Sequence, residues 1–178
     1  MTIRIAGIES ESIVDGPGFR FAVYTQGCPH GCPGCHNPQT HPFEGGKLAE
    51  PAKLLELAQS SPLNNGITLS GGEPFCQAHE LAEFARLARD AGYGIWAYSG
   101  YTYEQLTGDN APQGASELLD LVDVLVDGRF VQELSSYDAS WKGSTNQRVI
   151  DVKRSAAAGK PILWDDASSL DAFQIPKS

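Results

Sequence analysis

Long apolar runs are missing from the sequence. No stretch of about 18 apolar residues occurs, and a helix that crosses a membrane needs about that many. The N-terminus, Met1-Thr2-Ile3-Arg4, also lacks the charged and then apolar order of a signal peptide. We therefore expect a soluble, cytoplasmic protein with no membrane partner.

Positive charge is scarce. The chain has 13 Lys and Arg residues against 22 Asp and Glu residues, which gives a formal net charge of -9. Nucleic-acid binding depends on basic side chains that neutralise phosphates. The composition therefore argues against nucleic acid as the main partner and favours a folded protein or a small molecule.

Internal repeats and low-complexity tracts are absent. The 19 glycines and 11 prolines are spread between apolar segments, and 41% of the residues are hydrophobic. A chain of 178 residues can bury one substantial core but has little room for a second. We expect a single domain over residues 1–178.

Cysteine is sparse, but three of the four cysteines are crowded together. Cys28, Cys32 and Cys35 lie within eight residues, whereas Cys76 stands alone. In a reducing cytosol, crowded cysteines are more often metal ligands or redox groups than disulfides. An isolated cysteine is more often a small buried apolar residue, and we expect this of Cys76.

The pattern of apolar residues predicts strands that alternate with helices. Such alternation indicates βαβ units and a parallel sheet. About five strands cannot complete an eight-stranded barrel, so we expect an α/β fold that forms an open, partial βα barrel of parallel strands. The predicted strands cover residues 20–26, 66–69, 95–98, 122–126 and 148–152, and the predicted helices cover 48–60, 78–91, 116–120 and 153–158.

The helix over 78–91 has the clearest periodicity. Leu81, Phe84, Ala85 and Ala88 recur at the spacing of one buried helix face, and Gly92 is expected to end the helix. In the helix over 48–60, the apolar side is expected to come from four leucines, namely Leu48, Leu54, Leu55 and Leu57.

The clustered cysteines follow the first predicted strand with the spacing C-x3-C-x2-C. Two prolines and two glycines let so short a loop turn its thiolates toward one point. Iron-sulfur clusters are normally held by four cysteines, and structural zinc takes four Cys or His ligands. The spacing alone leaves two interpretations open: a zinc site completed by His30 or His36, or a four-iron cluster with one iron open to a substrate.

A second motif, Ser70-Gly71-Gly72-Glu73-Pro74, also follows a predicted strand. Adjacent glycines permit a tight turn, and they also permit close approach of the backbone to a ligand. Sites in α/β folds collect at the carboxyl ends of parallel strands. Both motifs are expected at that edge.

Together, the two motifs resemble those of the radical S-adenosylmethionine enzymes. The cysteine loop, followed by His36-Asn37-Pro38, is similar to the signature in which three cysteines hold a 4Fe-4S cluster and the methionine moiety binds the fourth iron. The resemblance implies metal ligands at Cys28, Cys32 and Cys35. It also implies S-adenosyl-L-methionine contacts at Gly34, Cys35, His36, Gly71, Gly72 and Glu73.

Further segments resemble one branch of these enzymes, the glycyl-radical activases of anaerobic ribonucleotide reductase. Gly34 stands before the third cysteine, where the wider superfamily commonly has an aromatic residue. The resemblance extends from about Ile13 to Val152, and the last 25 or so residues carry no recognisable motif. Its weaker segments are residues 15–20, 98–101, 126–130 and 142–148.

The resemblance implies an activity. The enzyme would reductively cleave S-adenosylmethionine to a 5′-deoxyadenosyl radical, which abstracts hydrogen from a glycine of anaerobic ribonucleotide reductase. The cofactor carries the difficult chemistry, so no catalytic side chain is expected beyond the cluster. A flavodoxin-like protein is the expected electron donor, and the partner's glycine loop must enter the open barrel. The alternatives are a formate-lyase activase, a deazaguanine synthase, or a zinc-stabilised binding module without catalysis.

Overall fold

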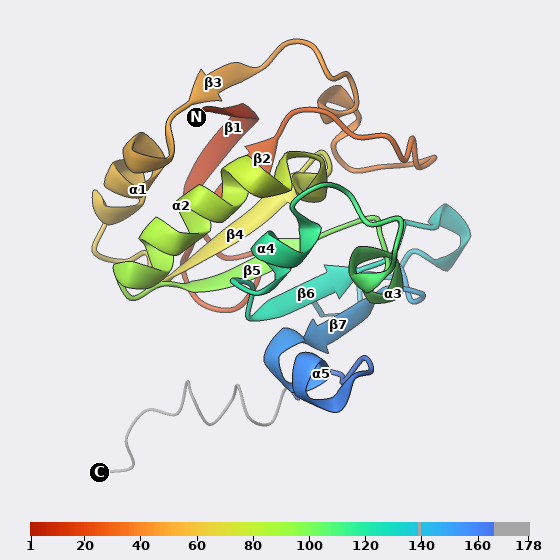
Figure 1. The fold of residues 1–178 in the computed structure, drawn as a ribbon. Coiled ribbons are helices and arrows are strands. Elements are labelled where there is room, and N and C mark those ends of the chain that lie inside the picture. The colour runs from red at the N-terminus through yellow and green to blue at the C-terminus, as the bar shows by residue number, and fades with distance from the viewer. Residues whose placement is uncertain (139, 166–178) are drawn as a thin grey trace.

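The computed structural model describes residues 1–138 and 140–165. Seven strands form one open sheet in the order β3-β1-β2-β4-β5-β6-β7 (Figure 1). The strands are β1 (Ile3–Ser12), β2 (Arg20–Thr25), β3 (Lys47–Ala49), β4 (Gly66–Gly71), β5 (Gly94–Tyr98), β6 (Val124–Asp127) and β7 (Arg148–Asp151). The helices are α1 (Pro51–Gln59), α2 (Ala78–Asp90), α3 (Tyr103–Thr107), α4 (Ala115–Leu119) and α5 (Val152–Ala158), with 3-10 turns η1 (Pro38–Thr40), η2 (Pro74–Gln77) and η3 (Gln132–Leu134).

Four parallel strands form the centre of the sheet. β2, β4, β5 and β6 pair in parallel with their neighbours, and they correspond to the first four predicted strands. The expected α/β class and open sheet are therefore confirmed. Residues 166–178, the end of the expected single domain, lie outside the described residues.

The expectation of an all-parallel sheet is wrong, because the sheet is mixed. β7 pairs antiparallel with β6, and β1 pairs antiparallel with both β2 and β3. A parallel neighbour requires a crossover that returns the chain to the opposite edge. The described part of the connection between β6 and β7 contains the η3 turn but no α-helix, so the chain enters β7 from the edge where β6 ended.

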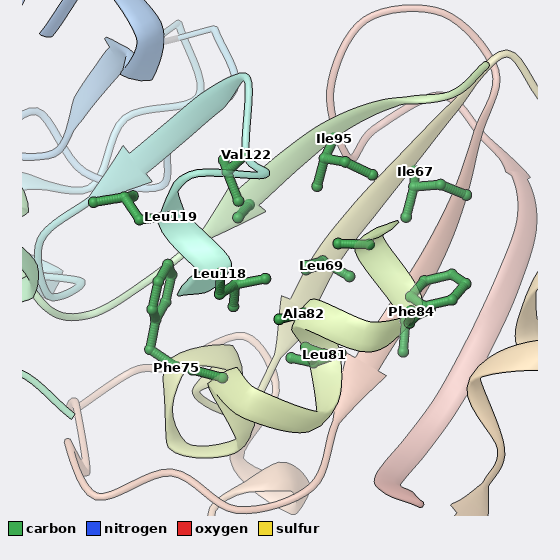
Figure 2. Packing of buried hydrophobic residues seen from close by; sticks show 14 of the residues in the cluster. Ile67, Leu69, Phe75, Leu81, Ala82, Phe84, Ile95, Leu118, Leu119 and Val122 are labelled. Atoms are coloured by element: carbon green, nitrogen blue, oxygen red, sulfur yellow. The ribbon is translucent and has the colours of Figure 1, made fainter. Parts of the chain in front are cut away.

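The main core lies between the sheet and the helices. Alternate strand residues such as Phe21, Leu69 and Ile95 point to this face, and α1, α2 and α4 lie over it (Figure 1). Figure 2 shows Leu81 and Phe84 of α2 packed among side chains of β4 and β5. Leu81, Phe84, Ala85 and Ala88 are all fully buried, which confirms the periodicity predicted for this helix.

The opposite face of the sheet, here called the inner face, has a different character. Trp96, Val124 and Val126 form a second buried cluster, onto which Trp141 and Trp164 pack. The Trp96 ring lies edge-on to both of these tryptophans, with ring centroids 6.0 and 5.2 Å apart. The inner face is therefore lined by large aromatic side chains on the β5 to β7 side.

Arg20 occupies the inner face beside these aromatic rings. Its guanidinium donates to the Thr68 hydroxyl at 2.8 Å and to the Ile67 carbonyl at 2.8 Å, and it lies 5.8 Å from the centroid of the Trp96 ring. Burial lowers the pKa of Arg20 to about 10. A buried cation is thus held by hydrogen bonds and by an aromatic face rather than by water.

Some predicted boundaries shift. The helix expected over 48–60 begins at Pro51, and Leu48 lies exposed in β3 because the chain pairs with β1 before the proline starts the helix. Helix α3 has a capping box, with Thr102 and Gln105 as its two members, and was not predicted. Within the described residues, none of the helices has the length and apolar character needed to cross a bilayer.

Candidate active site at the carboxyl edge of the sheet

The predicted motifs meet at one edge of the sheet. The cysteine loop (residues 27–37) follows β2, the Gly-Gly-Glu-Pro loop (residues 71–74) follows β4, and the Ser99-Gly100-Tyr101 segment follows β5. Because these three strands are parallel, all three segments leave the sheet at its carboxyl edge. The sequence predicted this convergence.

Backbone hydrogen bonds fix both ends of the cysteine loop. The Gly27 amide donates to the Thr40 carbonyl at 2.7 Å, and the Cys28 amide donates to the His41 carbonyl at 3.0 Å. Gly27 has a φ of +106°, a conformation that strongly favours glycine. The chain therefore leaves β2, makes the loop, and is held beside its own starting point at the η1 turn.

The three thiols of this loop are partly exposed. Burial raises the pKa of the Cys28 thiol, and the nearby Glu73 and Cys32 raise it further, whereas the His30 and Gly31 amides act in the opposite direction. The Asn37 amide donates to Cys35 Sγ at 3.4 Å. Hydrogen bonds to sulfur are one of the means by which proteins tune iron-sulfur clusters.

The donor set of the loop consists of soft ligands, of the kind that iron-sulfur clusters take. Among the described residues, no three His, Cys, Asp or Glu side chains are arranged to hold one metal ion. In a four-iron cluster each cysteine binds a different iron. Three thiols and no carboxylate in the loop are the soft donors that such clusters take.

Two glycines let the Gly-Gly-Glu-Pro loop lie directly against the root of the cysteine loop. The Gly72 amide donates to the Thr25 carbonyl and the Glu73 amide to the Gly27 carbonyl, both at 2.8 Å. A Cβ atom on Gly71 would lie 2.5 Å from the Thr25 nitrogen, and one on Gly72 would lie 2.3 Å from the Gly27 oxygen. The glycine pair is therefore required by contact between two backbones, a reason that the sequence analysis did not give.

The Glu73 carboxylate is fully buried and accepts four hydrogen bonds. Oε1 accepts from the Phe75 amide at 3.0 Å and from the Ser99 hydroxyl at 2.8 Å. Oε2 accepts from the Gly100 amide at 2.8 Å and pairs with His30 Nε2 at 2.7 Å. This carboxylate thus connects the segments that follow β2, β4 and β5.

His30 was missed by the sequence analysis, which gave it only as an alternative zinc ligand. Its side chain is 3% exposed, and its ring lies edge-on to Tyr101 with centroids 4.6 Å apart. Nothing in the sequence around His30 distinguishes it, because its partner Glu73 is 43 residues away.

The Gly34–His36 segment, expected to contact S-adenosyl-L-methionine, packs against residues that follow β6. The His36 ring lies 5.0 Å from the Phe130 ring, and a Cβ atom on Gly34 would lie 2.9 Å from Gln132 Cδ. Glycine before the third cysteine therefore leaves room for the Gln132 side chain. Phe130 and Gln132 are neighbours of the site that sequence reasoning did not identify.

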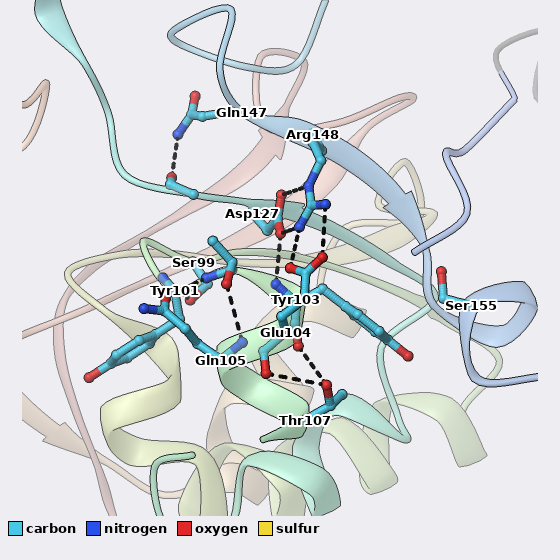
Figure 3. Close-up of polar contacts among 12 residues, drawn as sticks. Ser99, Tyr101, Tyr103, Glu104, Gln105, Thr107, Asp127, Gln147, Arg148 and Ser155 are labelled. Atoms are coloured by element: carbon cyan, nitrogen blue, oxygen red, sulfur yellow. Dashed lines mark hydrogen bonds and ion pairs between the residues drawn. The ribbon is translucent and has the colours of Figure 1, made fainter. Parts of the chain in front are cut away.

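The 142–148 segment, one of the weaker segments of the resemblance, makes its contacts with other parts of the same chain. Arg148 pairs with the buried Asp127 at 2.5 Å and with Glu104 at 2.6 Å (Figure 3). Asn146 Nδ2 donates to the Arg129 carbonyl at 2.9 Å, and Lys142 Nζ donates to the Gln147 carbonyl at 3.2 Å. These contacts give the segment a structural role at the end of β6 and β7.

Cys76, expected to be buried, is exposed, so that prediction is wrong. In the η2 turn, Pro74 and Phe75 are buried, and Cys76, the residue after them, lies at the surface. Cys76 is separated from the other cysteines in sequence and lies outside the cysteine loop.

Comparison with known proteins agrees with this arrangement. A family model described as a 4Fe-4S single cluster domain matches residues 14–150, and the chain belongs to this family. Within it, the similar curated proteins are named anaerobic ribonucleoside-triphosphate reductase-activating proteins. The one from Escherichia coli (strain K12) is 37% identical over 146 residues, covering 77% of this chain and 91% of the relative. The one from Salmonella typhimurium (strain LT2) is 39% identical over 145 residues, with the same coverage of 77% and 91%. The Vibrio cholerae relative is 34% identical over 143 residues, covering 76% of this chain and 89% of its own.

Proposed function

We propose that this protein uses a 4Fe-4S cluster and S-adenosylmethionine to generate the glycyl radical of an anaerobic ribonucleotide reductase. The observation that carries the proposal is the joining of a three-thiol loop to a glycine-rich loop at the carboxyl ends of the parallel strands β2 and β4. Kinship with reductase-activating proteins over most of the chain supports the identity of the target.

The roles of the residues follow from their chemistry. Cys28, Cys32 and Cys35 would bind three irons and leave the fourth to the methionine end of S-adenosylmethionine. When bound and reduced, the cluster supplies the electron that cleaves S-adenosylmethionine into methionine and a 5′-deoxyadenosyl radical. An ammonium group only donates hydrogen bonds, so the loop would hold the ligand's ammonium through carbonyl oxygens, which are acceptors.

The Gly34–His36 segment would border the adenine, with the ring of His36 held beside Phe130. We propose that the open sheet serves as a partial barrel of the radical S-adenosylmethionine type, within a single domain.

The inner face would receive the partner's glycine loop. An alkyl radical is unselective, so the site must exclude water and hold its target in contact. An open cavity of about 380 Å³ beside β7, lined in part by Trp141, Asn146 and Trp164, gives the incoming chain a place to dock. We propose a flavodoxin-like protein as the electron donor and the cytoplasm, where thiols stay reduced, as the location.

An anaerobic assay tests the proposal. The reduced protein alone should release 5′-deoxyadenosine slowly. Addition of the partner reductase should produce a glycyl radical doublet in electron paramagnetic resonance on the partner chain, and replacement of that glycine by Ala should remove the doublet. Stoichiometric modification of a small molecule without any partner protein would contradict the proposal and favour another small radical enzyme.

A further inference from the structure

We propose that His30 and Glu73 are positioning residues, which hold the cysteine loop at a fixed place relative to the Gly-Gly-Glu-Pro loop. The inference rests on the proposed function, because it assigns these side chains the task of setting the cluster against the methionine end of S-adenosylmethionine. Neither side chain is assigned contact with the reacting atoms.

The hydrogen bonding of Glu73 supports a bridging role rather than direct ligand binding. An ionised carboxylate has about four acceptor sites. Four protein groups donate to the Glu73 carboxylate, two to each oxygen, and the side chain is 0% exposed. A ligand ammonium would have to displace one of these donors to reach the carboxylate.

The hydrogen bond between His30 and Glu73, here called the bridge, connects the cysteine loop to the Gly-Gly-Glu-Pro loop. His30 lies between Cys28 and Cys32 in the sequence, so displacement of its backbone moves two of the thiol-bearing residues. Its Nε2 atom lies 2.7 Å from Glu73, which follows Gly72 directly. The backbone bonds at the root of the cysteine loop do not reach this far, since they involve Gly27 and Cys28. The His30–Glu73 pair is therefore the contact that ties the middle of the cysteine loop to the second loop.

The imidazole is held in place by packing as well as by its hydrogen bond. The Tyr101 ring lies against one side of it. On another side, a Cβ atom on Gly100 would lie 2.3 Å from His30 Cδ2, so the glycine is what lets the ring fit. Gly100 is not among the glycines with positive φ, so its backbone conformation suits alanine. The alanine Cβ would, however, clash with the His30 ring.

The chain provides a matched control pair. His79 Nδ1 lies 2.9 Å from Glu117, which repeats the His–Glu chemistry on the surface, where the side chains are 54% and 30% exposed. Gly7, in β1, has no atom within 4 Å of the position where a Cβ would be built. Substitutions at His79 and Gly7 thus reproduce the chemical changes at positions outside the His30–Glu73 contact.

The test compares His30→Leu, which removes the donor, with His30→Gln, whose amide nitrogen can replace Nε2. Each reconstituted protein is measured anaerobically for its iron and sulfide content and for its affinity for S-adenosylmethionine. A third measurement is the change that S-adenosylmethionine causes in the electron paramagnetic resonance spectrum of the reduced cluster. We expect His30→Leu to keep its iron but bind S-adenosylmethionine at least tenfold more weakly, with the spectral change lost. His30→Gln should restore most of both, and His79→Leu should match the wild type.

Gly100→Ala is the second variant, and it leaves every polar group in place. We expect Gly100→Ala to weaken S-adenosylmethionine binding as His30→Leu does, and Gly7→Ala to bind S-adenosylmethionine like the wild type. If His30→Leu does not fold, Gly100→Ala tests the inference by itself. Wild-type affinity in Gly100→Ala, or a loss in His30→Leu that only parallels loss of iron and of folded protein, overturns the inference. If the wild-type protein itself binds neither iron nor S-adenosylmethionine, the proposed function fails instead.

Discussion

At the scale of single residues, the four cysteines differ in where the fold places them. Replacement of Cys28, Cys32 or Cys35 by Ala should abolish cluster assembly, because each removes one of three thiols on the same loop. Cys76→Ala should retain the cluster, since Cys76 lies exposed in η2. Iron and sulfide per chain after anaerobic reconstitution measure both effects. Loss of the cluster in Cys76→Ala as complete as in the others would mean that no iron is left open.

Gly72 gives a second prediction at this scale. In Gly72→Ala, the new Cβ would lie 2.3 Å from the Gly27 oxygen, and backbone atoms cannot easily move aside. Overpacking of this kind costs about 1 to 3 kcal/mol. We expect both a lower Tm and poorer iron loading, because the clash lies at the root of the cysteine loop. Gly7→Ala is the control, and normal iron loading in Gly72→Ala would show that the two loops are not coupled there.

The residues of the site could be predicted from sequence where the motif is local. Three cysteines within eight residues and a glycine pair after a strand are visible in the chain itself. The His30–Glu73 contact and the packing of His36 on Phe130 join positions far apart in sequence. Such contacts depend on which strands become neighbours, and no local pattern reports them.

At the scale of elements, Arg148 joins β7 to β6 and to α3. Arg148→Ala should lower the free energy of unfolding by about 3 kcal/mol, because it leaves the Asp127 carboxylate, only 1% exposed, without its cation. Urea unfolding measures the change. Arg154→Ala, an exposed change in α5, should stay within about 0.5 kcal/mol of the wild type.

The ion pair between Arg148 and Glu104 predicts a pH dependence of stability. Hydrogen bonding to Arg148 lowers the pKa of Glu104 below its ordinary value. A depressed carboxyl pKa contributes stability above the ordinary pKa, and that contribution disappears as the pH falls through the lowered value. The difference in stability between wild type and Arg148→Ala should therefore shrink in acid. A difference that grows as the pH falls would contradict this assignment.

Two features of the strands could not be predicted from the sequence or were missed, namely the direction of β7 and the presence of β1. The residues of β7 were predicted as a strand, but strand direction is set by the path of the preceding connection. The described residues of the connection, 128–138 and 140–147, include glycines and polar residues that fold back at the carboxyl edge. The strand β1 was missed, although Ile3 and Ile5 alternate with polar and small residues.

At the scale of the whole molecule, the core and the cysteine loop are separate. The main buried cluster contains no residue of the cysteine loop. Removal of iron with a chelator should therefore leave the far-ultraviolet circular dichroism unchanged and the Tm within about 5 °C, equivalent to a loss of no more than about 2 kcal/mol at this size. A zinc-stabilised module would instead unfold without its metal and release zinc rather than iron and sulfide.

The alternation along the parallel strands has a consequence for how such a protein can diversify. Residues such as Phe21 and Leu69 hold the helices, while Tyr24, Ser70 and Tyr98 occupy the alternate positions that face the other way. Substitutions at these alternate positions leave the helix-side packing intact. New recognition properties can therefore evolve, or be selected from a library confined to the inner face, on a scaffold whose helix-side core stays the same.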